Sequence, residues 1–103
     1  MLQKDKILGY LGLATRAGRA VSGEFSVEKS VRQNRAKLVI VSEEASENSR
    51  KNFHNLCTYY KIPLYFFGSK EELGAACGKE LRVSVAVEDE GLARAAIRQL
   101  EQN

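Results

Sequence analysis

The 103-residue sequence has little of what many metal-dependent, membrane-spanning or disordered proteins contain. Its one histidine, His54, and its two cysteines, Cys57 and Cys77, lack the paired spacing of a zinc site. No apolar run approaches the roughly 18 residues that a transmembrane helix needs, so no membrane span is expected. With one proline and 44% hydrophobic residues, the chain is expected to fold around a packed core.

Short motifs of known enzymes are present only in incomplete form. The stretch SVEK (26–29) matches the Ser-x-x-Lys pattern of some acyl-transfer enzymes, but the companion motifs are missing. The stretch GSK (68–70) lacks the first glycine of a phosphate-binding loop at the required distance. His54 lies on a polar helix face, which is typical of a surface residue. We therefore expect no catalysis, no metal and no cofactor.

The first residues only superficially resemble a secretory signal. Lys4 and Lys6 precede the apolar stretch ILGYLGLA, but this stretch is short, is interrupted by Gly9 and Gly12, and has no convincing cleavage site after it. We expect a cytoplasmic protein with two buried, reduced thiols.

Positive charge is concentrated in the first third of the chain. Residues 1–37 contain eight Lys or Arg and three Asp or Glu, whereas residues 38–103 contain eight and ten. This asymmetry indicates a polyanionic partner. A solvated basic face that maintains solubility explains the charge alone equally well.

Hydrophobic periodicity and capping signals divide the chain into alternating helices and strands. The predicted elements are a helix over about 4–17, a short strand over 19–22, a helix begun by Ser22, a strand over 37–42, a helix begun by Ser46, a strand over 64–67, a helix begun by Ser69, a strand over 83–87 and a helix begun by Asp89. The order predicts an α/β fold, a three-layer α/β/α sandwich with a small mixed central sheet of about four strands, in one domain over 1–103.

Two details of packing follow from the same patterns. Gly9 and Gly12 each cost the first helix about 1 kcal/mol relative to alanine, which predicts close approach of another backbone. In the second helix, Phe25, Val27 and Val31 are expected to be its apolar positions.

The start of the second helix combines features that suit a phosphate. Gly23 allows a close backbone approach, and a helix start offers unpaired N–H groups and partial positive charge. Lys29 shares a helix face with Phe25 and Ser26. Arg16 and Arg19 end the preceding helix, so a phosphate could meet amides, a lysine and arginines together. An ordinary amphipathic helix with its charges in water accounts for this composition equally well.

Two longer stretches, SGEFSVEKSVRQNRAKLVIVSEEAS (22–46) and LCTYYKIPLYFFGSKEELGAACGKE (56–80), resemble the ribosomal-protein L-seven-Ae superfamily of kink-turn RNA binders. Its small bacterial YlxQ-type members are the most similar. The resemblance covers nearly the whole chain and implies the fold expected above, together with RNA binding. The implied target is a sharply bent duplex in which a bulge is followed by tandem sheared G·A pairs.

The resemblance also implies which residues contact RNA. The family signature Gly-x-Asn-Glu-x-x-Lys falls on residues 23–29, so Gly23 is implied to allow backbone approach and Lys29 to contact guanine or phosphate. Phe25 and Ser26 replace the Asn and Glu of the signature, which alters the base-edge hydrogen bonds, although Ser26 can still donate and Glu24 can substitute.

A loop and a lysine complete the implied site. The family covers the bulged nucleotides with the loop before its last strand, which here holds Glu80, Leu81, Arg82 and Val83. Lys37, just before a strand, resembles a family contact to the RNA backbone.

We therefore expect a non-enzymatic RNA-binding protein, ribosomal or ribosome-associated, whose target is ribosomal RNA or an mRNA leader. It is expected to be monomeric and to bind neither DNA nor membranes. One alternative is a protein-interaction module on the same fold, with Phe25 as an anchor in a partner's pocket. A second alternative is a small-molecule enzyme, which a closed apolar pocket would favour.

Overall fold

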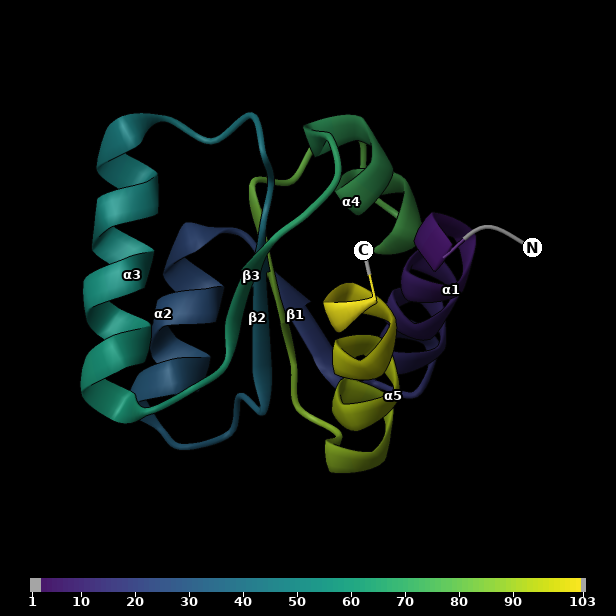
Figure 1. Cartoon of the computed structure of the whole chain (residues 1–103), viewed down its shortest axis with the longest axis horizontal. Coiled ribbons are helices and arrows are strands. Elements are labelled where there is room, and N and C mark those ends of the chain that lie inside the picture. The colour runs from purple at the N-terminus through teal and green to yellow at the C-terminus, as the bar shows by residue number, and fades with distance from the viewer. Residues whose placement is uncertain (1–2, 103) are drawn as a thin grey trace.

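The structure is a computed structural model that describes residues 3–102, so residues 1, 2 and 103 of the predicted domain lie outside the described residues. Helices and strands alternate along the chain, as the sequence predicts (Figure 1). The elements are α1 (Gln3–Arg16), β1 (Ala20–Ser22), α2 (Glu24–Arg32), β2 (Leu38–Val41), α3 (Glu47–Tyr60), β3 (Leu64–Phe66), α4 (Lys70–Ala76), β4 (Ser84–Val87) and α5 (Glu90–Glu101).

The strands form one mixed sheet in the order β1-β4-β2-β3. Strand β4 is antiparallel to both of its neighbours, β1 and β2, while β2 and β3 are parallel. Val87 of β4 lies opposite Ala20 on one side and Leu38 on the other. The predicted mixed sheet of about four strands is confirmed, and β1 is one of its two edge strands.

Two helical layers cover the sheet. Helices α2 and α3 lie on one face, and α1, α4 and α5 lie on the other (Figure 1). All four residues of β2 are buried, as its β-branched sequence predicts. Leu38 and Ile40 pack in the core below α1 and α5, whereas Val39 and Val41 pack in the core below α2 and α3. No helix within residues 3–102 has both the length and the apolar character to cross a bilayer.

Three helices begin where their capping residues predict. The Ser46 hydroxyl accepts a hydrogen bond from Ser49 N (3.1 Å), and the Asp89 carboxylate accepts one from Leu92 N (2.8 Å). The capping box of α4 is complete, because Ser69 Oγ accepts from Glu72 N and Glu72 Oε1 accepts from Ser69 N. These local signals are satisfied by neighbours in the sequence, so the sequence alone was sufficient to place them.

The predicted start of α2 is wrong by one residue. Ser22 is the last residue of β1, and Gly23 is the N-cap, with φ +94° and no side-chain capping bond. The chain turns from the edge strand into the helix through a left-handed backbone conformation that glycine adopts readily. The Ser22 hydroxyl is instead the acceptor of a bond from Arg82.

Of the three apolar positions predicted in α2, Phe25 does not face the core. Its side chain is 79% exposed, whereas Val27 and Val31 are fully buried. Successive helical residues are about 100° apart, so Phe25 lies about 200° from Val27 around the helix and cannot share its face. An exposed aromatic ring therefore stands at the first turn of α2.

The close backbone approach predicted for the first helix occurs elsewhere. Space around Gly9 is open, and at Gly12 the Ala76 carbonyl oxygen makes only an ordinary contact. At Gly74 of α4, an added Cβ would lie 2.5 Å from the carbonyl oxygen of Glu80 and 2.8 Å from Leu81 N. The loop that precedes β4 is therefore seated directly on α4.

We expect Gly74→Ala to lower the free energy of unfolding by about 1 to 3 kcal/mol, because backbone atoms of Glu80 and Leu81 must move to admit the methyl group. Gly9→Ala is the matched control. It also replaces a helical glycine, but its surroundings are open, so a gain of about 0.5 to 1 kcal/mol is expected. Urea unfolding measures both. An equally stable Gly74→Ala protein would contradict the seating of the loop on α4.

Candidate functional site

Three adjoining hollows run along β1 and α2 and share lining residues. The first hollow and the middle hollow lie nearest the start of α2 and share the lining residues Val21 and Ser26. The middle hollow and the third hollow, beyond the end of α2, share Arg35 and Glu88. We call the three together the α2 groove. One acid, Glu88, lines it, together with six basic residues: Arg19, Lys29, Arg35, Lys37, Lys79 and Arg82.

The two acidic side chains of α2 lie on the side of the helix that faces away from this groove. Glu24 accepts a hydrogen bond from Ser49 Oγ (3.2 Å), and Glu28 accepts one from Asn52 Nδ2 (2.5 Å). Both acids are therefore turned toward α3, while the exposed Lys29 lines the groove on the other side of the helix. A helix whose net charge is small thus presents positive charge on one side.

The N-terminal end of α2, with Gly23, is one end of this site. Gly23 N donates to Ser84 O (3.0 Å), which fixes the helix start to β4. Among the described residues, no side chain caps the first turn of α2. Its free N–H groups and the partial positive charge of the helix dipole make this end attractive to an anion.

The loop over residues 79–83 places an arginine beside the helix start. Arg82 Nε donates to Ser22 Oγ (2.9 Å), one residue before Gly23. The loop is itself anchored to α4, because Arg82 N donates to Lys70 O and Lys79 N donates to Gly74 O. An anion at the start of α2 can therefore meet backbone amides and a guanidinium together.

The structure brings most of the predicted site residues together. Phe25, Ser26, Lys29, Lys37 and Arg82 line the α2 groove, with Gly23 at the helix start.

The remaining predicted residues lie at the margin of the groove. Leu81 is 52% exposed and Glu80 is exposed on the same loop, whereas Val83 is half-buried and packs against the α2–α3 core. Glu24 is at the helix start, but its carboxylate bonds to α3.

Several residues line the groove without having been predicted to do so: Arg35, Lys79 and Glu88. Arg35 belongs to the basic stretch before β2, which is the signal that could have identified it. Glu88 follows β4 directly, at the end of a strand where loops of an α/β fold gather, but a single acid at such a position is too common to be informative.

The two thiols are buried, as predicted, and are unsuited to nucleophilic chemistry. Cys57 is 2% exposed, and burial raises its pKa to about 11. Burial also raises the pKa of Cys77, although Thr15 and Arg82 lower it in part. Both thiols are therefore protonated at neutral pH, and thiolate is the reactive form. His54 is exposed, as predicted.

Comparisons with known proteins agree with this architecture. A model of the Ribosomal protein L7Ae/L30e/S12e/Gadd45 family matches residues 5–97. RNA-binding protein YlxQ of Bacillus subtilis is 48% identical over 91 residues, covering 88% of this chain and 91% of that protein. Large ribosomal subunit protein eL30 of Candida albicans is 35% identical, covering 78% and 76%.

A solved structure of a protein with unknown function from Bacillus halodurans C has a TM-score of 0.89 at 36% identity, covering 92% of this chain and 96% of that one. The family match extends over nearly the whole chain, as does the similarity to the solved structure. The chain is therefore a member of the Ribosomal protein L7Ae/L30e/S12e/Gadd45 family.

Proposed function

We propose that this protein binds structured RNA without catalysis and recognises a kink-turn-like bend through the start of α2 and the loop over residues 79–83. The observation that carries the proposal is the uncapped helix start beside Arg82, in a groove lined by six basic residues and one acid. Two relatives, an RNA-binding protein and a ribosomal protein, support an RNA partner.

The physics of a bent duplex explains why such a groove suits it. A sharp bend crowds phosphates together, and their mutual repulsion opposes the bend. Fixed cations and helix-terminal amides offset that repulsion without having to be reorganised on binding. The major groove of regular A-form RNA is too narrow for side chains, whereas displaced bases at a kink open a route to base edges and faces.

Each residue at the helix start and in the adjoining loop makes a different contact with the RNA. Lys29 contacts guanine or phosphate, and the absence of any heavy atom within 4 Å of a Cβ added at Gly23 leaves room for the RNA backbone. The exposed ring of Phe25 stacks on a base, which replaces the hydrogen bonds of the family's Asn and Glu. Ser26 donates a hydrogen bond, and Leu81 makes apolar contact with a bulged nucleotide.

Within the cell, the family and its ribosomal members support a ribosome-associated role, for which we propose a cytoplasmic monomer. The RNA is then a segment of ribosomal RNA or an mRNA leader. The test is to sequence the RNA that the purified protein retains at moderate salt. Enrichment of segments with a bulge followed by tandem G·A pairs is expected, and retention of random RNA fragments would contradict the proposal.

The exposure of Phe25 also supports a second candidate, a protein-docking module on the same fold. An aromatic side chain that is 79% exposed can insert into a pocket of a partner protein as well as stack on a base. In that case Phe25→Ala would abolish capture of a protein partner, while the affinity for any RNA would be weak and insensitive to its shape.

A further inference from the structure

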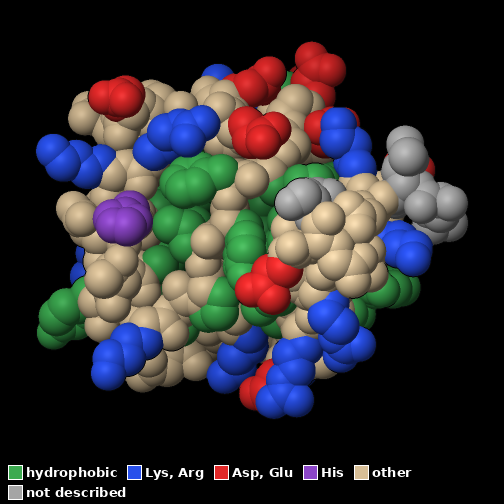
Figure 2. Space-filling view, in the orientation of Figure 1, with side chains coloured by type: hydrophobic (Ala, Val, Ile, Leu, Met, Phe, Trp, Pro, Cys, Tyr) green, Lys and Arg blue, Asp and Glu red, His purple; other side chains and the backbone are tan. Residues whose placement is uncertain are grey.

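The far end of the α2 groove, opposite the loop over residues 79–83, holds a second cluster of charge. It is lined by Gly18, Arg19, Arg35, Lys37 and Glu88, and we call it the cation pocket. Figure 2 shows Lys and Arg side chains along the lower border of the molecule, which includes the start of α5 and the loops below the sheet. Of these residues, Lys37 was expected to contact the RNA backbone, and Arg19 was expected to contribute to a phosphate site near the start of α2.

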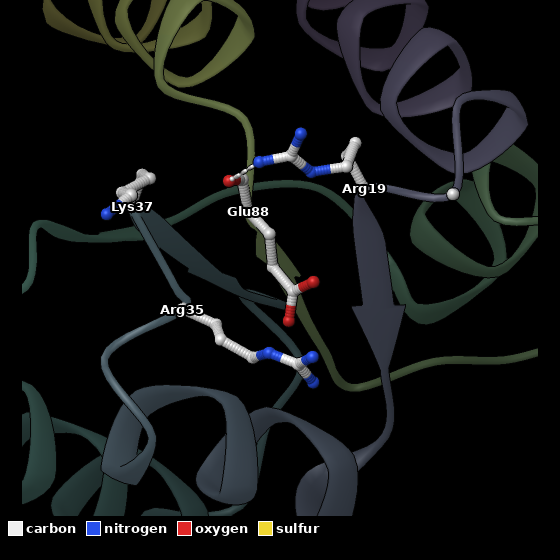
Figure 3. A pocket seen from close by; sticks show the side chains of 5 residues that line it. Arg19, Arg35, Lys37 and Glu88 are labelled. Carbon is white, nitrogen blue, oxygen red and sulfur yellow. Dashed lines mark hydrogen bonds between the residues drawn. The ribbon is translucent and has the colours of Figure 1, made fainter.

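The sheet itself assembles this pocket. Because β4 pairs with β1 on one side and β2 on the other, Ala20 and Leu38 both lie opposite Val87. The residues just before them, Arg19 and Lys37, therefore flank Glu88, which follows Val87 (Figure 3). Glu88 N donates to Arg19 O and Lys37 N donates to Val87 O, each at 2.7 Å, so the backbone fixes both positions.

Hydrogen bonds hold two of the charged side chains in the pocket, those of Glu88 and Arg19, but no ion pair within the described part of the chain neutralises them. Ser30, which is 3% exposed, donates from Oγ to the Glu88 carboxylate (2.7 Å), and Arg19 donates to the Glu88 carbonyl oxygen (2.9 Å). The side chains of Arg35 and Glu88 point toward each other (Figure 3), yet within residues 3–102 no salt bridge joins Glu88 to a basic residue. Three cationic residues and one carboxylate thus line the pocket, which leaves net positive charge to attract an anion.

We propose that the cation pocket binds a second backbone phosphate of the same RNA, in a stem that continues from the bend. This inference rests on the proposed function. Between Arg82 and Glu88 the chain passes through β4, and six extended residues at roughly 3.3 Å each span at most about 20 Å. An RNA that reaches both ends of the groove must therefore extend well beyond the bend. Guanidinium and ammonium groups suit a phosphodiester, and contacts of this kind position a duplex without reading its bases.

The experiment uses two variants of opposite expected sign, titrated against kink-turn hairpins that carry no terminal phosphates. One hairpin has about ten base pairs on each side of the kink, and two others have one stem shortened to about three. On the long hairpin, Arg35→Gln should weaken binding about three- to tenfold and reduce the salt slope by about one. Glu88→Gln keeps an acceptor for Ser30 but removes the repelling charge, so binding should tighten about threefold or more.

The controls separate this inference from the proposed function. Arg98→Gln, an equal charge change on α5, should leave affinity unchanged. The effects of Arg35→Gln and Glu88→Gln should disappear on one of the two shortened hairpins, the one that lacks the stem reaching the pocket. If Arg35→Gln and Glu88→Gln leave the long hairpin unaffected while Lys29→Ala weakens it, the cation pocket binds no phosphate and the proposed function stands. Weaker binding by Glu88→Gln would also overturn the inference, because the carboxylate would then be a contact to RNA donors. If Lys29→Ala has no effect either, both proposals fail.

Discussion

Lys29→Ala is expected to weaken binding of a kink-turn hairpin by about 10- to 100-fold, which is about 1 to 3 kcal/mol. The lysine lies in the middle hollow of the α2 groove, one helical turn beyond Phe25, and its side chain is exposed. It makes no packing contact that the core depends on, so the thermal unfolding midpoint should not change. Filter binding or gel shift measures the loss.

Lys51→Ala is the matched control for this prediction. Lys51 is an exposed lysine of α3 and does not line the α2 groove, yet its replacement changes the net charge equally. If Lys51→Ala weakens RNA binding only slightly and Lys29→Ala weakens it strongly, the loss of affinity is due to the position of Lys29 in the groove. Equal losses would mean that RNA responds only to the overall charge of the protein.

Gly23→Val is expected to reduce binding at least tenfold through the backbone. Gly23 has φ +94°, which a β-branched residue adopts only with strain, and the position where its side chain would stand is open. The folded protein should lose about 1 to 3 kcal/mol of stability to that strain. The loss of RNA affinity should be larger than the loss of folding stability explains, because the new side chain occupies the space that the RNA backbone needs.

A glycine with similar geometry distinguishes strain from obstruction. Gly78 also has a positive φ, +72°, and open surroundings, but it lies at the end of α4. Gly78→Val should therefore show a similar loss of stability with a much smaller loss of affinity. Normal RNA binding by a folded Gly23→Val protein would exclude close approach of RNA to this backbone.

The fold was accessible from the sequence wherever a signal is local. The serine and aspartate caps of α3, α4 and α5 bond to amides three residues on, and the unbroken apolar run of β2 is buried on both faces. The start of α2 was misplaced because Ser22 resembles a cap, whereas the sheet pairing retains it as the last residue of β1. Gly74 was missed because the loop that packs on it is specified only by the tertiary fold.

The site was accessible from the sequence only in part. Residues 23–29 are contiguous, so one helix start could be recognised as a unit. The cation pocket could not, because Arg19, Lys37 and Glu88 become neighbours only through antiparallel pairing on both sides of β4. Strand order is a property of the whole chain, and neither composition nor periodicity specifies which strand lies in the centre.

The most direct test compares two RNAs of the same base composition, a kink-turn hairpin and an unkinked duplex, over a range of salt concentrations. If the start of α2 and the adjoining loop bind crowded phosphates, the kinked RNA should bind at least tenfold more tightly. With about four to six phosphates contacted, its affinity should fall with a logarithmic salt slope near −3 to −5. Equal affinity for the two RNAs, or a slope near zero for the kinked one, would contradict recognition of an RNA bend by this groove.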